Sequence, residues 1–177
     1  MIKNFIGHFK TITTHKLIVM KYCFKVGLYK QGLFHDMSKY SWTEFSSGLK
    51  YYTGNSSPNG VEKQQIGYSK AWLHHKGRNK HHFEYWMDYS IEPKEGIIGA
   101  EMPTKYVVEM FIDRMAACKN YLKHKYEDNS PLIYYKRGRN YCIMHDNTRE
   151  LLEELLNKLA IDGEEKTIKY IKNVILN

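Results

Sequence analysis

The sequence predicts an all-α protein, built as a single compact helical bundle of about five to seven helices. Apolar residues recur at every third or fourth position over most of the chain, which is the period of an amphipathic helix. Glycine and proline separate these periodic stretches, as they do between helices. With 177 residues, 42% of them hydrophobic, the chain is long enough to bury a core. We therefore expect one domain over residues 1–177.

The first half of the chain is expected to form three main helices. In the first of them Ile18, Tyr22 and Val26 mark an apolar stripe. Ser41 and Glu44 have the spacing of a capping box, which predicts a helix start at Ser41. The expected helices cover about residues 14–26, 41–51 and 61–75, with a short helical piece over 29–36 and a loop over 53–60.

The second half is expected to contain the longest helix, from Pro103 to about His124, because proline suits a first helical position. Asn147 and Glu150 predict the start of another helix, which runs to about Leu159, and Gly163 separates it from a final helix. Residues 88–102 are expected to be a loop with room for a short strand pair, and residues 128–145 a second loop.

The composition limits the partners. A net charge of +8 attracts anions, which include phosphorylated metabolites, nucleic acid and acidic membrane surfaces, and the charge alone does not choose among them. Nucleic acid is a weaker alternative, because only five of the 27 basic residues are arginine. No run approaches the ~18 apolar residues of a membrane span, and residues 1–20 lack the apolar core of a signal peptide, so no membrane partner is expected. A weak basic amphipathic anchor is the alternative for residues 1–20, and a first helix of the domain is the favoured interpretation. Three widely spaced cysteines favour a reducing, cytoplasmic location.

The adjacent pair His35 and Asp36 is the first candidate for a functional site. At the end of a helical turn both side chains can point at one ion, and this donor pair suits Zn, Mn, Fe, Co or Ni. A His-Asp dipeptide alone is poor evidence, because a capping Asp beside an incidental His gives the same pattern. His15 on the first helix strengthens the interpretation of this pair as a metal site. So does Asp113, which lies among apolar residues where an unpaired carboxylate is costly.

The order His, His-Asp, Asp on successive helices resembles the HD-domain superfamily of metal-dependent phosphohydrolases. The run G-L-F-H-D-M-S-K over residues 32–39 is similar to that superfamily's signature of two apolar residues, His-Asp, two variable residues and Lys. The resemblance implies that His15, His35, Asp36 and Asp113 bind metal and that Lys39 contacts a substrate phosphate. His8 is the alternative to His15, because the stretch between His15 and His35 is shorter than is usual there.

A second histidine cluster lies in A-W-L-H-H-K-G-R-N-K-H-H-F-E-Y-W, residues 71–86. Two histidine pairs on either side of a turn can bring one imidazole from each side to a common point. HD proteins with two metals take extra histidines from this interval, so the resemblance implies one or two ions, the second bridged by Asp36. The candidates here are His74, His75 and His82 as ligands, His81 as the alternative to His82, and Arg78 as a phosphate contact. A surface patch that binds phosphate without metal is the alternative interpretation.

Other acidic residues are candidates for supporting roles. Glu109 lies one helical turn before Asp113 and is a candidate base or additional ligand, with an ordinary salt-bridged glutamate as the alternative. Glu44 and Glu84 are candidates to accept the second N–H of a ligand histidine. His145 and Asp146 repeat the His-Asp dipeptide, but their place before a helix favours capping.

The motifs H-D-M-S-K-Y-S-W-T-E-F, A-W-L-H-H-K-G-R-N-K-H-H-F-E-Y-W and M-P-T-K-Y-V-V-E-M also resemble a family of short bacterial and phage HD-like proteins. This resemblance covers most of residues 32–113 and implies no substrate.

Three functions follow as hypotheses. The first is a metal-dependent hydrolase of a phosphate ester, such as a nucleotide or a related metabolite. The second keeps a di-metal site but uses iron for oxygenase or other redox chemistry. The third is a basic helical module that binds nucleic acid or a protein partner, for which the net charge and the aromatic-basic stretch over residues 134–139 are the evidence.

Overall fold

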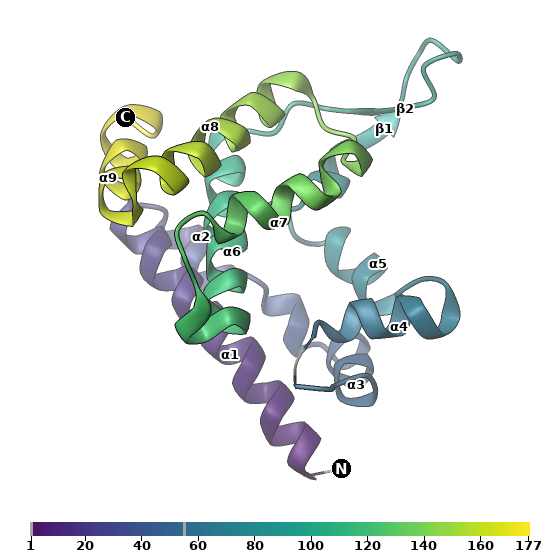
Figure 1. Cartoon of the computed structure of the whole chain (residues 1–177). Coiled ribbons are helices and arrows are strands. Elements are labelled where there is room, and N and C mark those ends of the chain that lie inside the picture. The colour runs from purple at the N-terminus through teal and green to yellow at the C-terminus, as the bar shows by residue number, and fades with distance from the viewer. Residues whose placement is uncertain (1, 55) are drawn as a thin grey trace.

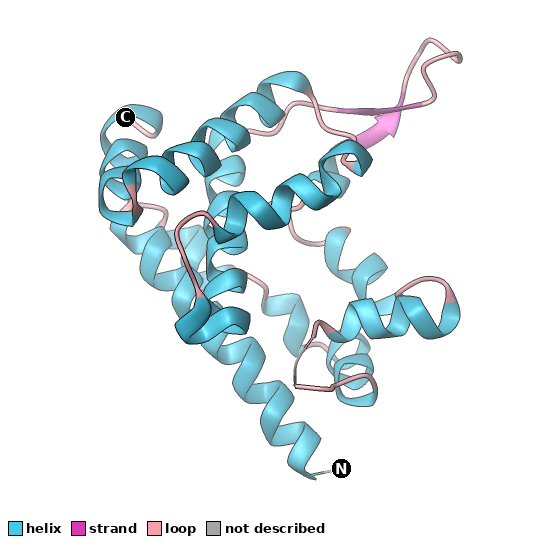
Figure 2. Cartoon of the chain, viewed as in Figure 1, coloured by secondary structure: helices cyan, strands magenta, loops and turns pink. Residues whose placement is uncertain are grey.

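The computed structural model describes residues 2–54 and 56–177, and these residues form nine α-helices and one pair of short strands (Figures 1 and 2). The fold is compact and all-α, as the periodicity predicts, with more helices than the expected five to seven. The helices are α1 (Ile2–Lys25), α2 (Tyr29–Phe34), α3 (Trp42–Lys50), α4 (Pro58–Ile66), α5 (Lys70–Lys76), α6 (Thr104–Leu122), α7 (Ser130–Gly138), α8 (Asp146–Asp162) and α9 (Glu164–Tyr170). No helix in the described residues is long and apolar enough to cross a membrane.

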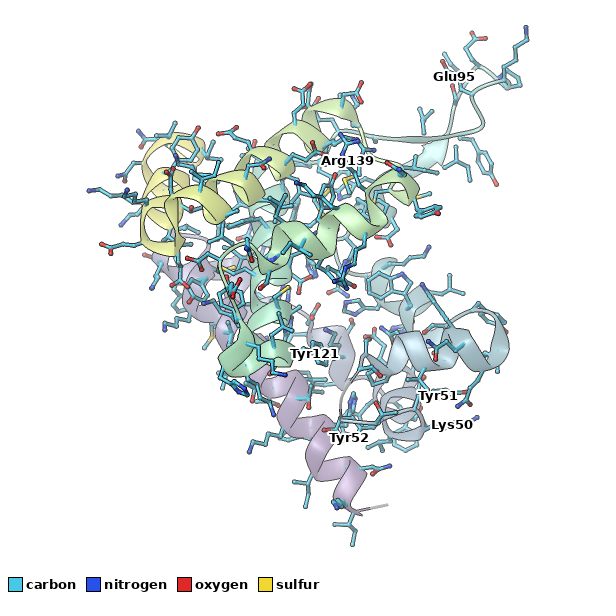
Figure 3. The ribbon with its side chains drawn as sticks, in the orientation of Figure 1. Lys50, Tyr51, Tyr52, Glu95, Tyr121 and Arg139 are labelled. Carbon is cyan, nitrogen blue, oxygen red and sulfur yellow. The ribbon has the colours of Figure 1, made fainter. Side chains whose placement is uncertain are left out.

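Short 3₁₀ turns connect several helices, and two of them border the candidate site. These are η1 (Met37–Tyr40), directly after the His-Asp pair, and η2 (Phe83–Trp86), directly after the second histidine pair. Strands β1 (Met87–Tyr89) and β2 (Ile97–Gly99) form an antiparallel hairpin with Asp88 opposite Ile98. Glu95 lies near the tip of this hairpin, away from the helices (Figure 3). The other turns are η3 (Lys123–Lys125), η4 (Arg139–Tyr141) and the π-helical η5 (Ile171–Ile175).

The core is centred on α6, which packs against α1 on one side and α8 on another. Phe111, Ile112 and Met115 of α6 are fully buried, and they meet Val19 of α1 and Leu155 of α8 in one apolar cluster. Helices α3 to α5 pack on one another and form a separate group beside α1 (Figure 1). The long helices α1 and α6 therefore provide a rigid base on which the shorter segments place their side chains.

Several predicted element boundaries are wrong. α1 begins twelve residues before the predicted start at residue 14, since most apolar side chains of its first turns are exposed and lie away from the buried face of the helix. The predicted single helix over 61–75 is two helices, because Gly67 adopts a left-handed conformation with φ of 84° and ends α4. The predicted loop over 128–145 contains α7, whose Pro131 occupies a first-turn position and whose Tyr135 is buried.

Two predicted caps are also different in the structure. Ser41 does stand at the N-cap of α3, but its side chain makes no capping hydrogen bond and Glu44 turns toward two histidines instead. α8 is capped by His145 and not by Asn147: the Nδ1 atom of His145 accepts a hydrogen bond from the backbone N–H of Asn147 at 3.2 Å. The capping interpretation of the second His-Asp dipeptide is thereby confirmed.

Candidate metal centre

The His35–Asp36 pair lies in the corner between α2 and η1. Asp36 has a left-handed backbone with φ of 55°, a conformation that Asp tolerates better than most residues. Lys16 of α1 holds the corner in place, since its Nζ atom donates to the backbone oxygens of Leu33 at 2.7 Å and His35 at 2.9 Å. The turn directs both side chains inward, and both residues are almost completely buried.

The first group of candidate ligands combines this corner with the two long helices. Its donor atoms belong to His15 of α1, Asp113 of α6, and the pair His35 and Asp36. Nε2 of His15 lies 2.9 Å from Oδ1 of Asp113 and 3.6 Å from Oδ2 of Asp36. Nε2 of His35 lies 3.3 Å from that Asp36 oxygen and 3.5 Å from the Asp113 oxygen. All four residues that the HD resemblance implies are therefore brought together.

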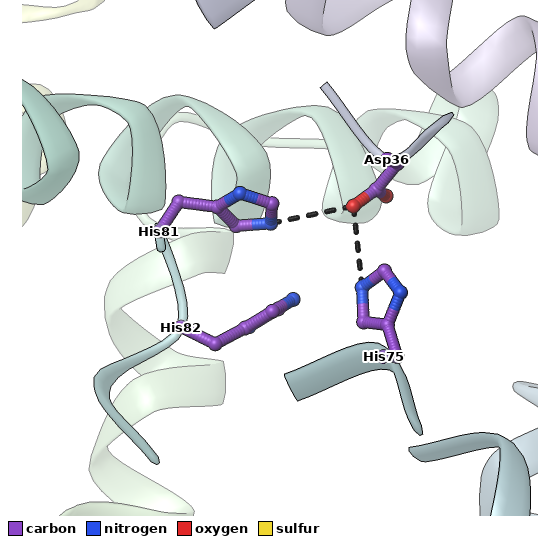
Figure 4. Close-up of side chains that lie close together, drawn as sticks. All are labelled: Asp36, His75, His81 and His82. Carbon is purple, nitrogen blue, oxygen red and sulfur yellow. Dashed lines mark ion pairs between the residues drawn. The ribbon is translucent and has the colours of Figure 1, made fainter. Parts of the chain in front are cut away.

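The second group uses the other oxygen of Asp36. Oδ1 of Asp36 lies 3.2 Å from Nε2 of His75 and 3.3 Å from Nε2 of His81, as the dashed lines in Figure 4 show. His82 completes the group, with its ring 4.2 Å from that of His81 and 4.8 Å from that of His75 between centroids. Both histidines of the 81–82 pair thus belong to the group, although the sequence offered them as alternatives.

Two glutamates next to these groups orient the imidazoles, and one of them, Glu109, also forms a third possible ligand group with His35 and His81. Glu44 of α3 accepts hydrogen bonds from Nδ1 of His74 at 2.7 Å and Nδ1 of His75 at 2.8 Å. Oε1 of Glu109 on α6 accepts from Nδ1 of His35 at 2.9 Å and lies 3.2 Å from Nδ1 of His81. A carboxylate on Nδ1 leaves Nε2 as the free nitrogen, and in His35, His75 and His81 this Nε2 atom faces Asp36. The predicted orienting role of Glu44 agrees with this geometry.

The buried atoms at the centre lack partners in a way that fits a cation. Among the described residues, both carboxylate oxygens of Asp36 and the Nε2 atoms of His75, His81 and His82 are buried and make no hydrogen bond, although Lys39 forms an ion pair with Oδ2 of Asp36. Such groups are costly unless something satisfies them. An ion with bonds of about 2.1 Å places neighbouring donors roughly 3.0–3.4 Å apart, and the spacings within both groups cluster around this range. Imidazole with carboxylate is the donor set of Mn, Fe, Co, Ni and Zn sites.

The charges of the centre also favour a bound cation. Four buried or nearly buried carboxylates converge on it: Asp36, Asp113, Glu44 and Glu109. Burial opposes their ionisation, but the imidazoles beside them, together with Lys39 at Asp36, lower the pKa of all four below the usual range. The centre is therefore strongly anionic, and without a metal it needs protons and a lysine for balance.

Those protons reside on two of the histidines. Burial lowers the pKa of His35, but the carboxylates of Asp36, Asp113 and Glu109 outweigh it and raise that pKa well above its usual value. Asp36 and Glu44 likewise raise the pKa of His75 against the effect of burial. Burial and the neighbouring His81 and His75 lower the pKa of His82, which stays neutral.

Lys39 lies at the border of the centre. Its Nζ atom is 2.5 Å from Oδ2 of Asp36, and its side chain is 28% exposed. Asp113 is the other partly exposed member, with 17% of its side chain accessible. A cavity of about 70 Å³ begins at Lys39 and is lined also by Thr11, Asn59 and Tyr121. Glu44 also lines this cavity, whereas none of the ligands of the two groups does.

Three further sequence candidates, His74, Arg78 and His8, also lie outside both groups. His74 contacts Glu44 and the structure does not bring it to Asp36. Arg78 donates from Nη1 to the backbone oxygen of His74 at 3.3 Å. His8, the alternative to His15, is buried against Phe45 and Tyr52, and burial together with the charge of Lys39 lowers its pKa to about 4.

Comparison with known proteins gives a family but no activity. No curated protein and no solved structure matches the chain. The model of a family of unknown function, DUF5662, matches residues 4–158, which include every residue of the centre. The chain therefore belongs to the DUF5662 family.

Proposed function

We propose that this protein is a metal-dependent hydrolase of phosphate esters with a dinuclear centre bridged by Asp36. The observation that carries the proposal is that the two carboxylate oxygens of Asp36 face different sets of donor atoms. Its Oδ2 atom faces His15 and His35, and its Oδ1 atom faces His75 and His81. One carboxylate shared between two sets of donors is an arrangement suited to two ions and has no evident use in a purely structural cluster.

The residues present fit divalent transition ions. His15, His35, Asp36 and Asp113 would hold one ion, and Asp36, His75, His81 and His82 the other. When bound, such ions polarise a phosphoryl oxygen and lower the pKa of a water molecule. The protein's own part is to fix the donors, and Glu44 and Glu109 do so by holding the imidazole tautomers.

The position of Lys39, between the centre and a cavity, supports a phosphate ester as substrate. The Lys39 side chain is 28% exposed and its ammonium group pairs with Asp36, and a lysine at this position can also pair with a phosphate oxygen. The cavity beyond Lys39 is lined by hydroxyl and amide side chains such as Thr11, Asn59 and Tyr121. At about 70 Å³ it admits a small polar group, so a small alcohol, or only the end of a larger molecule, fits as the leaving group.

Turnover of simple esters tests the proposal. The protein is loaded in turn with Mn, Fe, Co, Ni and Zn and assayed with p-nitrophenyl phosphate, bis(p-nitrophenyl) phosphate and a set of mononucleotides. We expect hydrolysis that chelation abolishes and that Asp36→Asn reduces to background. Asp146→Asn is the matched control, because it changes the exposed Asp of the second His-Asp dipeptide.

Two outcomes would overturn the proposal. One is a metal-loaded protein that hydrolyses none of these esters. The other is hydrolysis that Asp36→Asn leaves unchanged, since the activity would then come from elsewhere. Oxygen consumption by the iron-loaded protein without ester hydrolysis would support the redox hypothesis instead.

A further inference from the structure

Helix α1 carries a second apolar stripe that faces solvent. Ile2, Ile6, Phe9, Leu17 and Phe24 are between 38% and 78% exposed. At 3.6 residues per turn these five positions fall within roughly a quarter of the helix circumference, away from the face that packs on α6. The stripe runs along the whole of α1, a helix about 36 Å long. Its N-terminal turns extend beyond the neighbouring helices (Figure 1).

Lysines border this stripe. Lys3, Lys10 and Lys21 are exposed and lie in one row along the helix, directly beside the apolar positions. Lys16 lies on the opposite border. Residues 2–35 contain six lysines and neither aspartate nor glutamate, although the whole chain has 19 acidic residues. The outer face of α1 is therefore apolar along its centre and positively charged along its edges.

The corner after α2 widens the apolar surface. Leu33, Phe34 and Met37 are 51%, 66% and 49% exposed. The corner lies beside the middle of α1, because Lys16 contacts both the backbone of Leu33 and the Sδ atom of Met37 at 3.2 Å. We call the α1 stripe, its bordering lysines and the side chains of Leu33, Phe34 and Met37 the α1–α2 face. None of these residues is a candidate metal ligand.

The chemistry of the α1–α2 face favours one occupant over the others. A second copy of the chain, docked through the same face, would bring two rows of lysines together. Nucleic acid is recognised by stacking aromatics and arginines, whereas most of the exposed apolar residues here are aliphatic and the cations are all lysine. An apolar stripe bordered by lysines is the arrangement of helices that lie in the interface of anionic membranes.

We propose that the α1–α2 face binds the surface of an anionic lipid bilayer, with α1 lying in the plane of the interface. The apolar stripe would enter the boundary between headgroups and acyl chains, and the lysines would pair with lipid phosphates. This proposal goes beyond the hydrolase function and does not depend on it, because the two sites share no residue.

Vesicle sedimentation tests the proposal with the full-length protein. Phosphatidylcholine vesicles with and without 40% phosphatidylglycerol are the probe, at about 0.1 M salt. The protein is expected to sediment only with the anionic vesicles. Lys10→Glu/Lys21→Glu should weaken binding at least ~10-fold. Ile6→Ser/Leu17→Ser should also weaken it strongly, because it removes apolar groups that enter the lipid.

Matched controls separate this face from general charge and hydrophobicity. Lys136→Glu/Lys172→Glu changes two exposed lysines elsewhere, and Ile91→Ser/Ile161→Ser changes two isoleucines that are 96% and 81% exposed. Both control variants should bind vesicles like the wild type. Circular dichroism confirms that each variant keeps its helices.

Three results would overturn the proposal. The first is the absence of binding to anionic vesicles. The second is an equal loss of vesicle binding in the test and control variants. The third is self-association that Ile6→Ser/Leu17→Ser abolishes, in a protein that does not bind vesicles. Binding to duplex DNA that depends on Lys10 and Lys21 but not on Ile6 and Leu17, without vesicle binding, would assign the face to nucleic acid.

Discussion

Oε1 of Glu109 lies 2.9 Å from Nδ1 of His35, and this contact fixes the ring so that Nε2 faces Asp36 and Asp113. Glu109 and Asp113 are one turn apart on α6. This helix therefore provides both a candidate ligand, Asp113, and the carboxylate that orients the candidate ligand His35. Orientation of this kind raises the basicity of the imidazole and reduces the entropy lost when an ion binds.

Removal of the charge on Glu109 should therefore weaken metal binding without removing a ligand from either group that contains Asp36. We expect Glu109→Gln to lower the affinity for Zn or Mn by about 10- to 100-fold. Competition with a chromogenic chelator measures the affinity. Glu95→Gln, in the exposed hairpin, is the control and should bind like the wild type. An unchanged affinity in Glu109→Gln would show that the contact to His35 has no role in the centre.

The two ligand groups should lose metal separately. Asp113→Asn removes a donor of the first group only, and His82→Ala removes a donor of the second group only. Each variant should retain about one ion fewer than the wild type, whereas His124→Ala, an exposed histidine outside the centre, should retain all. Elemental analysis after dialysis against a weak chelator checks this. If each variant lost both ions equally, the prediction that the two groups bind their ions separately would be contradicted.

Metal binding should release protons and strengthen as pH rises. The raised pKa values of His35 and His75 mean that the metal-free centre holds protons that a cation must displace. In the metal-free protein these two protonated imidazoles contribute to the free energy of unfolding. This contribution is fully present below their unfolded pKa of ~6.5, and it is lost as pH rises through the raised folded pKa. Metal affinity should therefore increase with pH until the pH exceeds the raised pKa values of His35 and His75, and level off above them. Calorimetric titration in buffers of different ionisation enthalpy measures the released protons, and an enthalpy independent of the buffer would contradict the prediction.

Alanine substitutions at two glycines should change the stability of the protein in opposite directions. A Cβ atom at Gly99 would lie 2.6 Å from the backbone nitrogen of His145 and 2.7 Å from the Cα atom of Met144, where strand β2 meets the start of α8. Backbone cannot move aside cheaply, so Gly99→Ala should destabilise the protein by ~1–3 kcal/mol. Gly60, inside α4, has nothing within 4 Å of that position, and Gly60→Ala should stabilise the protein by up to ~1 kcal/mol. Urea unfolding measures both, and a Gly99→Ala variant as stable as the wild type would contradict the first.

The sequence predicted the parts of the fold that depend on periodicity. The helices around Val19 and Phe111 have apolar residues at regular spacing, and both were expected near their observed positions. Helix α7 was missed, because Pro131, Gly138 and several basic residues are typical of a loop, while the burial of Tyr135 depends on tertiary packing. The break at Gly67 was missed because glycine inside a helical pattern does not by itself end a helix.

The sequence identified most members of the centre, but not their arrangement. His15, His35, Asp36 and Asp113 were expected together from their motif, and the structure places their donor atoms within one group. Adjacent residues on a helix point about 100° apart, so only one of His74 and His75 can reach Asp36, and the pattern does not say which. His81 and His82 lie in an irregular turn, where no periodicity predicts side-chain direction, and the structure brings both to the centre.

Elemental analysis of the freshly purified protein tests the central claim, a metal centre bridged by Asp36, most directly. The wild type should contain close to two equivalents of Mn, Fe, Co, Ni or Zn per chain, either as purified or after incubation with these ions. Asp36→Asn should lose both ions, because both groups share this carboxylate. A wild type that takes up none of these metals, or an Asp36→Asn variant that retains two ions, would contradict it.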